Sequence, residues 1–278
     1  MSRFSWENEW RLQNLKEESF LVQHVMDKTP KWVKLVEKKV PDSLQNTLET
    51  AFNKAFGAVF ENGAGIIEKT YRKDKQIQQY EANQEQMDTE GFNGRNVRKF
   101  ERQAKKTVVK NLAISSVEGI GFGLAGMGIP DIPIFVSVLL KSIYEIAISY
   151  GYSYDTDKEK LFILKVIDTA LKSGDVLRKK DEELNSLIER YCNEEVMPEK
   201  YGETDPFVVE LQIIRQIDFS AQALAHELLY GKFVQGATFV GVIGGTTDIV
   251  CLKRITEYAA LKYKRRFLLR QTVEDEMD

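Results

Sequence analysis

Two carboxylates in the middle of the chain are the residues best suited to acid or base chemistry. Asp131 ends a glycine-rich run, and Glu145 follows fourteen residues later in an apolar segment. A carboxylate used for proton transfer sits in a pocket that raises its pKa. Asp131 also suits the cap of the helix that follows, and Glu145 can pair with Lys141 one turn away. The sequence favours capping and pairing over an enzyme that hydrolyses a lipid or a peptide.

No metal or nucleophile motif accompanies these carboxylates. His226 and Glu227 begin like a zinc-protease motif, but the residue four positions after the histidine is Tyr230, so the second ligand is missing. The two cysteines, Cys192 and Cys251, lie far apart, and no Gly-x-Ser-x-Gly elbow is present. We therefore expect reduced cysteines, no metal and no cofactor.

The glycine-rich run has the spacing of a dinucleotide-binding fingerprint. Gly121, Gly123 and Gly126 form a G-x-G-x-x-G pattern. Glu145 lies near the distance expected for a ribose-binding acid. The fingerprint requires a preceding strand, whereas residues 100–116 show the pattern of a basic amphipathic helix. This context favours a packing role for the glycines over nucleotide binding.

Small residues recur every four positions in this run and again near the C-terminus, as in Gly119 with Gly123 and in Gly241 with Gly245. This spacing lets two helix backbones touch, in a buried crossing of a soluble bundle or in lipid, and both interpretations stay open. Two glycine-rich helical hairpins or close crossings are predicted. Their motif residues are Gly119, Gly121, Gly123, Gly126, Gly128, Pro130, Asp131 and Pro133, and then Gly241, Gly244, Gly245 and Asp248.

The C-terminal segment is the strongest electrostatic feature of the sequence. We predict one helix from Asp248 onward, with cations interleaved among aromatic and aliphatic residues. Such a helix suits anionic headgroups, and each cation adds on the order of 1 kcal/mol near a charged membrane. The alternative is a solvated outer face whose cations favour the C-terminal end of the helix dipole. The candidate membrane-surface residues are Lys253, Arg254, Lys262, Lys264, Arg265, Arg266 and Arg270.

The elements that must position these residues are helices, because apolar residues recur at three- and four-residue spacing. Helix starts are marked by Asp42, by Thr156 in a capping box, and by Asp205 ahead of a proline. Residues 71–106 predict two polar helices around a turn at residues 89–94. The pattern is typical of an all-α fold.

Composition limits the possible partners. The 278 residues carry a net charge of −3, so the whole-molecule field gives no general attraction to nucleic acid, and an electrostatic partner would meet a local patch. The N-terminus lacks the pattern of a signal peptide. Charges and prolines interrupt the longest apolar region, residues 112–150, which argues against a simple transmembrane helix but leaves a membrane-dipping hairpin open. These features indicate a cytoplasmic protein.

Several short motifs lie in the middle and C-terminal parts of the sequence. They are GMGIPDIP at residues 126–133, YEIA at 144–147, YGY at 150–152, DTD at 155–157, LFIL at 161–164 and VIGG at 242–245. These segments resemble the EcsC family, which is named for the third protein of a bacterial operon that also encodes an ABC transporter. The resemblance covers the C-terminal two thirds, and the N-terminal helices fit in general character. It implies a helical fold and a link to membrane transport or secretion, but no reaction. Asp248 departs from the small polar residue expected there.

Together these patterns predict a single, mainly helical domain, with polar and amphipathic helices over residues 1–110 and an EcsC-like core over residues 111–278. We expect a non-enzymatic accessory protein that associates peripherally with the inner face of an anionic membrane or with an ABC transporter. The alternatives are the hydrolase that uses Asp131 and Glu145, and a soluble adaptor that docks a partner helix on exposed apolar residues. Nucleic acid is not an expected partner.

Overall fold

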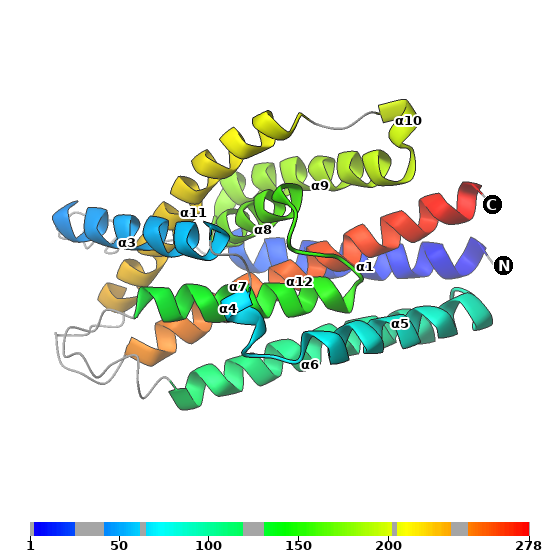
Figure 1. Cartoon of the computed structure of the whole chain (residues 1–278), viewed down its shortest axis with the longest axis horizontal. Helices are drawn as coiled ribbons and strands as arrows, with labels where there is room; N and C mark the ends of the chain where they lie inside the picture. The colour runs from blue at the N-terminus through cyan, green and yellow to red at the C-terminus, as the bar shows by residue number, and fades with distance from the viewer. Residues whose placement is uncertain are drawn as a thin grey trace.

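The computed structural model describes residues 3–25, 42–61, 65–118, 131–201, 205–234 and 244–277. Within these ranges it contains nine helices of 14 residues or more, two short helices and no strand, which confirms the all-α prediction (Figure 1). The helices are α1 Arg3–Val25, α3 Asp42–Glu61, α4 Gly65–Glu68, α5 Lys73–Glu90, α6 Gly94–Glu118, α7 Ile132–Ser149, α8 Asp157–Ala170, α9 Gly174–Val196, α10 Pro198–Tyr201, α11 Pro206–Val234 and α12 Gly244–Met277.

Helix α12 is the central element of the single domain. Its 34 residues contact α1, α6, α7, α8, α9 and α11. Helix α1 lies beside it, where the Gln13 side chain donates a hydrogen bond to the Leu261 carbonyl, so the two ends of the chain lie at the same end of the molecule (Figure 1). A helix surrounded in this way presents no wide face to solvent, whatever its composition.

Helix α7 is the most apolar helix, and it is also covered by neighbours. It is long and apolar enough to cross a membrane by length and composition, yet 72% of the relevant window is buried inside the protein. The helix packs against α3, α4, α5, α6 and α12, and side chains such as Leu139 and Ile143 have no exposed surface. A core helix of a globular fold has the same properties. Residues 132–149 therefore form part of the protein core.

Three predicted helix starts are confirmed by their caps. The Asp131 carboxylate accepts a hydrogen bond from the Ile134 amide at 3.2 Å at the start of α7. Thr156 does the same for α8 at 3.2 Å, and Asp205 accepts from the second residue of α11 at 2.9 Å. In each case a short polar side chain satisfies a backbone donor that has no partner within its own helix.

The predicted polar hairpin is also confirmed, as α5 and α6 with a turn at residues 91–93. Phe92 in this turn stacks on Trp6 of α1, and Asn96 donates a hydrogen bond to the Gly91 carbonyl at 3.1 Å. Helix α6 then continues without a break through residue 111, the point where the sequence suggested a change from N-terminal helices to core. The hairpin thus belongs to the same body as the core.

The glycine-rich motifs lie largely outside the described residues, which exclude 119–130 and 235–243, so the predicted close crossings stay predictions. Gly244 and Gly245 are described, and they form the first turn of α12. The prediction that this helix starts at Asp248 is therefore wrong by four residues. Packing contributes more to helix stability than propensity does, so a long helix surrounded by neighbours tolerates glycines in its first turn.

Candidate functional site

The two candidate acid–base residues do not converge. Asp131 is exposed at the N-terminus of α7, where its carboxylate caps the helix. Glu145 is 1% exposed near the other end of the same helix. Fourteen residues of α-helix separate them by about 21 Å, so the two groups cannot act on one bond.

Glu145 is held between three helices by amide groups. Gln76 of α5 donates a hydrogen bond to Oε1 at 2.7 Å, and Asn111 of α6 donates to Oε2. No ion pair with Lys141 is recorded in the described part of the chain, so the predicted pairing is wrong. The carboxylate points into the α5–α6 interface, where the two amides satisfy it. Its role in the fold is to fasten the polar hairpin to the core helix.

Aromatic residues in and beside the family-like motifs join the segment that precedes the hairpin to the core. Tyr144 stacks on Tyr154 with 4.1 Å between ring centroids. The Tyr154 hydroxyl donates to Glu68 and shares a 2.6 Å hydrogen bond with the hydroxyl of Tyr71. Burial raises the pKa of the Tyr71 and Tyr144 hydroxyls well above the ordinary value, so both are neutral at physiological pH. These contacts fasten α4 and the loop between α4 and α5 to α7 and the α7–α8 connection.

The YGY motif contains a position that only glycine fits. Gly151 has a φ of +79°, and a Cβ placed there would lie 2.2 Å from the ring of Tyr80. Both the backbone conformation and the close approach of the ring exclude other residues. The turn after α7 is thereby pressed against α5.

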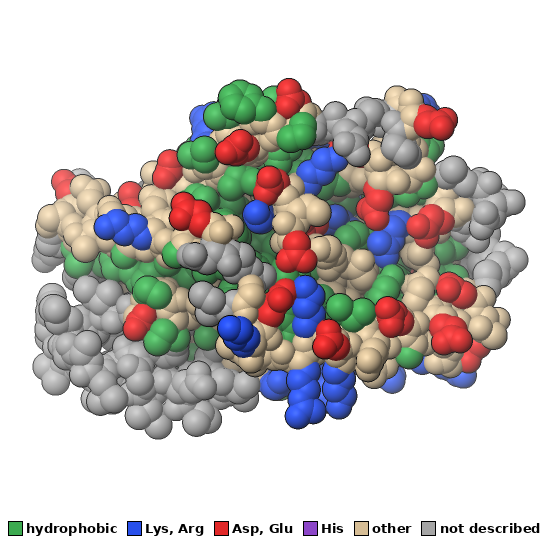
Figure 2. All heavy atoms as spheres, in the orientation of Figure 1, with side chains coloured by type: hydrophobic (Ala, Val, Ile, Leu, Met, Phe, Trp, Pro, Cys, Tyr) green, Lys and Arg blue, Asp and Glu red, His purple; other side chains and the backbone are tan. Residues whose placement is uncertain are grey.

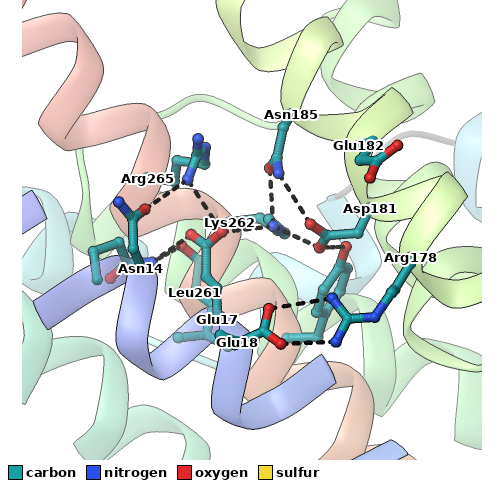
Figure 3. A network of polar contacts seen from close by, with 12 residues as sticks. Asn14, Glu17, Glu18, Arg178, Asp181, Glu182, Asn185, Leu261, Lys262 and Arg265 are labelled. Carbon is teal, nitrogen blue, oxygen red and sulfur yellow. Dashed lines mark hydrogen bonds and ion pairs between the residues drawn. The ribbon is translucent and has the colours of Figure 1, made fainter. Parts of the chain in front are cut away.

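Lys262 of α12 lies inside a cluster of polar groups from α1 and α9 (Figure 3). Its side chain has no exposed surface. The Nζ atom lies 3.0 Å from Glu17, 2.7 Å from Asp181 and 2.9 Å from Asn185. The Tyr258 hydroxyl donates to the same Asp181 at 2.7 Å. Two carboxylates and one amide oxygen therefore surround one buried cation.

Arg266 is buried one turn further along α12. Its guanidinium donates to both oxygens of Glu159, at 2.9 and 2.8 Å, and lies 4.0 Å from the ring centroid of Tyr152 and 4.5 Å from that of Phe162. Burial opposes ionisation, but the charge and hydrogen bonds of Glu159 together with Tyr152 and Tyr263 outweigh it and raise the pKa of Arg266 above its ordinary value. Nη1 is the donor in both hydrogen bonds, and the planar guanidinium lies over the two rings, a stacking geometry that arginine provides and lysine does not.

The remaining cations of α12 also contact carboxylates or backbone carbonyls of the protein. Lys264 is 3% exposed and lies 3.6 Å from Glu9 and 3.4 Å from Glu101. Arg254 is buried and donates to the Lys172 carbonyl. The remaining three predicted residues are the half-buried Arg265 and Arg270, paired with Glu17 and Glu195, and the exposed Lys253.

The prediction that the α12 cations face lipid or solvent is therefore wrong for Arg254, Lys262, Lys264 and Arg266. The physical reason is that six helices surround α12, and α1, α6, α8 and α9 contribute carboxylates opposite its cations. Only Lys253 of the seven is exposed, and it lies 3.8 Å from Glu257 one turn away. The described contacts of α12 are those of a core helix.

Helix α6 presents the basic surface that α12 lacks. Six of its cations are exposed, and five of them take part in no ion pair recorded in the described ranges. Lys105 is the sixth, and it lies 3.2 Å from Glu101. Figure 2 shows Lys and Arg side chains gathered along the lower edge of the molecule, where α6 runs. We name this surface the α6 basic face, and its residues are Arg95, Arg98, Arg102, Lys105, Lys106 and Lys110.

The sequence contained the signal for this surface. The cations follow the three- and four-residue spacing of one helical face, and Glu101 is the single acid between Arg95 and Lys110. The sequence pattern predicts a basic amphipathic helix here, which argues against a nucleotide-binding fold. Its exposed cations were not among the predicted membrane-surface residues. The rejection of a nucleotide-binding fold is supported, because the element before the glycine-rich run is a helix and not a strand.

The metal-site motif at His226 does not develop into a site. No group of three or more metal-ligating side chains is found among the residues that the structure describes. Cys192 and Cys251 are both buried, and neither forms a disulfide among the described residues. Burial raises the pKa of the Cys192 thiol to about 11, which keeps it protonated and unreactive.

Comparisons with known proteins agree with the motifs. The EcsC protein family matches residues 7–268, so the match also includes the N-terminal helices that the motifs did not cover. Protein EcsC of Bacillus subtilis (strain 168) is 23% identical over 240 residues, covering 84% of this chain and 90% of that protein. The uncharacterized protein YdbA of the same organism is 25% identical over 169 residues, covering 59% and 56% of the two chains. No solved structure gives a significant match. With nearly its whole length matched, the chain belongs to the EcsC protein family.

Proposed function

We propose that this chain is a non-enzymatic accessory protein that associates peripherally with an anionic membrane surface through the α6 basic face. The observation that carries the proposal is the set of exposed cations on one side of a helix, most of them without a recorded ion pair in the described structure. Cations that a fold pairs internally hold the fold together. Cations left at the surface are available to a partner.

The dimensions of the α6 basic face suit a lipid surface. From Arg95 to Lys110 it extends over fifteen residues, or about 22 Å of helix. Each cation near an anionic bilayer contributes on the order of 1 kcal/mol, so six supply enough for reversible binding. Val109 lies among them and is 67% exposed, which offers an apolar contact at the headgroup level. Long basic side chains also adjust to headgroups without a fixed geometry.

Acidic residues on α5 restrict how the protein approaches such a surface. Glu81, Glu85 and Asp88 are exposed on the helix beside α6. In Figure 2 acidic side chains face the viewer over the α5 region, whereas the basic ones lie along the lower edge. A negative membrane repels the first set and attracts the second, so the α6 edge is the one that approaches. A membrane is also where the transporter implied by the family resemblance would be met.

Vesicle flotation tests the proposal. The full chain is mixed with vesicles of phosphatidylcholine alone, or of phosphatidylcholine with phosphatidylserine. We expect it to float only with the anionic vesicles, and to stay at the bottom in about 1 M salt, where the screening length is about 3 Å. The variant R98E/R102E/K106E should lose flotation. A matched variant, K54E/K69E/K179E, makes the same charge change at exposed lysines on other elements and should retain most of it.

Three results would overturn the proposal. The first is a wild-type chain that stays at the bottom of the gradient with anionic vesicles at low salt. The second is equal loss of flotation in the two triple variants, because binding would then follow net charge and not the α6 basic face. The third is equal flotation with both lipid compositions.

A further inference from the structure

The first half of α11 exposes an apolar stripe on the side away from the core. The buried side of this helix follows the usual spacing and consists of Val209, Ile213, Gln216 and Ser220. On the opposite side Phe207 is 63% exposed, Leu211 51% and Ile214 59%. We name these three residues the α11 stripe. A contiguous exposed apolar surface of this kind marks an interaction site more often than scattered apolar residues do.

The α11 stripe lies far from the α6 basic face. In Figure 1 the start of α11 is at the upper edge of the molecule and α6 is at the lower edge. Figure 2 shows apolar side chains uncovered at that upper edge. A partner on the stripe and a membrane on α6 would therefore not compete for space.

The spacing within the stripe is that of a helix-pairing seam. The steps of four and then three residues place Phe207, Leu211 and Ile214 at consecutive core positions of a heptad. Glu210 then lies directly before a core position, and Arg215 lies directly after the next one. In a parallel helix pair these two flanking positions, five residues apart, face each other across the seam, where ion pairs select the partner. Both residues are exposed.

We propose that the occupant of the α11 stripe is a second copy of this chain, paired with the first in parallel about a two-fold axis. Self-pairing places Glu210 of each copy beside Arg215 of the other. Helix α11 therefore carries both the acidic and the basic member of each ion pair across the interface. An isologous interface of this kind needs no other protein. An anionic lipid surface fits less well, because Asp205, Glu210 and Asp218 at or beside the stripe are exposed acids.

The residue at the next core position limits the strength of this association. It is occupied by Asp218, which is exposed. In the parallel pair the two Asp218 carboxylates face each other, so the apolar seam ends after Ile214. The seam is then less than two heptads long, and we expect dimers to form only at high protein concentration.

Analytical ultracentrifugation of the full chain tests the pairing, from about 1 µM to about 1 mM. The wild-type chain should dimerise within this range, and Leu211→Asp should abolish dimerisation. Asp218→Leu should tighten it at least tenfold, because it replaces facing carboxylates with apolar contact. All these positions are exposed, so the fold is retained, and circular dichroism with urea unfolding verifies this for each variant.

Charge exchange gives the sharpest test. Glu210→Arg and Arg215→Glu should each weaken dimerisation at least tenfold, since each change places like charges opposite each other on both sides of the seam. An equimolar mixture of the two single variants restores both attractive pairs, so it should form mixed dimers with near wild-type strength. The double variant E210R/R215E should behave in the same way on its own.

Two results would overturn the pairing. One is a wild-type chain that remains monomeric throughout the concentration range. The other is a mixture of the single variants that associates no better than either alone, which would assign the stripe to a different occupant or to another orientation. The membrane proposal stands apart from both, because R98E/R102E/K106E should dimerise normally and Leu211→Asp should still float.

Discussion

Helices α6 and α12 have the same number of cations and opposite uses for them. Each contains seven Lys and Arg residues. On α12 four of the seven are buried and two more are half-buried, and the carboxylates that pair with them come from α1, α6, α8, α9 and α11. On α6 six of the seven are exposed. The difference lies in position: α12 runs through the middle of the bundle and α6 along its edge.

This difference separates the cations whose removal would destabilise the fold from those whose removal would have little effect on stability. A buried ion pair contributes little against an apolar replacement of both partners, but removal of one partner leaves the other charge unpaired in a low-dielectric interior. An exposed cation is solvated with or without a partner. The α12 residues are therefore fixed by the structure, whereas those of α6 are free to serve an external surface.

Lys262→Met should show the largest effect. The substitution keeps most of the side-chain volume but leaves Asp181 buried without its cation and Glu17 paired with Arg265 alone, so we expect the free energy of unfolding to fall by about 3–5 kcal/mol. Urea denaturation measures it. Lys106→Met, the matched change on α6, should shift the free energy by no more than about 0.5 kcal/mol. Equal losses from the two variants would refute the distinction between the helices.

Arg266→Lys should show the next largest effect. Lysine keeps the charge but lacks the planar guanidinium that stacks on the rings of Tyr152 and Phe162, and we expect the free energy of unfolding to fall by about 2–3 kcal/mol. The matched Arg102→Lys on α6 should change stability very little. A double-mutant cycle with Glu159→Gln should give a coupling energy well above zero. Simple additivity would show that the pair contributes only through its separate residues.

Acid pH should weaken the contact where the two helices meet. Burial of Glu101 on α6 opposes its ionisation, but Lys16 and the Lys264 charge outweigh it and lower its pKa from 4.5 to about 2. A carboxyl with a lower pKa in the folded state stabilises the fold above pH 4.5, and this stabilisation is lost as the pH falls from 4.5 towards 2.

Glu101→Gln tests this contribution. The variant should be less stable at neutral pH by about 1–2 kcal/mol and should lose less stability across the acid range. Urea midpoints measured at a series of pH values give both quantities. Glu81→Gln on α5, which has no ion pair recorded in the described structure, is the control and should keep the wild-type acid profile. If stability depended on pH in the same way in Glu101→Gln and in the wild type, Glu101 would not contribute to the loss of stability in acid.

Sequence reasoning succeeded where the deciding interaction is local. Asp131, Thr156 and Asp205 each bind an amide two or three residues away, so their capping roles follow from sequence spacing. The polar hairpin around residues 91–93 was predictable for the same reason. Local signals of this kind predicted the all-α class and the starts of α7, α8 and α11.

Prediction from the sequence failed where the interacting side chain is distant in the chain. Lys262 is paired with Glu17, 245 positions away, and Arg266 with Glu159, 107 positions away. Periodicity describes one helix, and it cannot show how many other helices surround that helix. The same limit applies to Glu145, whose partners Gln76 and Asn111 replaced the expected neighbour on its own helix.

Lys253 should show the smallest effect, and it tests whether burial or membership of α12 decides the outcome. It belongs to the core helix, yet its side chain is 59% exposed and its Nζ lies 3.8 Å from Glu257. An exposed pair one turn apart contributes about 0.3–0.5 kcal/mol. Lys253→Ala should therefore reduce the free energy of unfolding by no more than that, and flotation with anionic vesicles should not change. If Lys253→Ala lost as much free energy of unfolding as Lys262→Met, the loss would depend on membership of α12 and not on the burial of each cation.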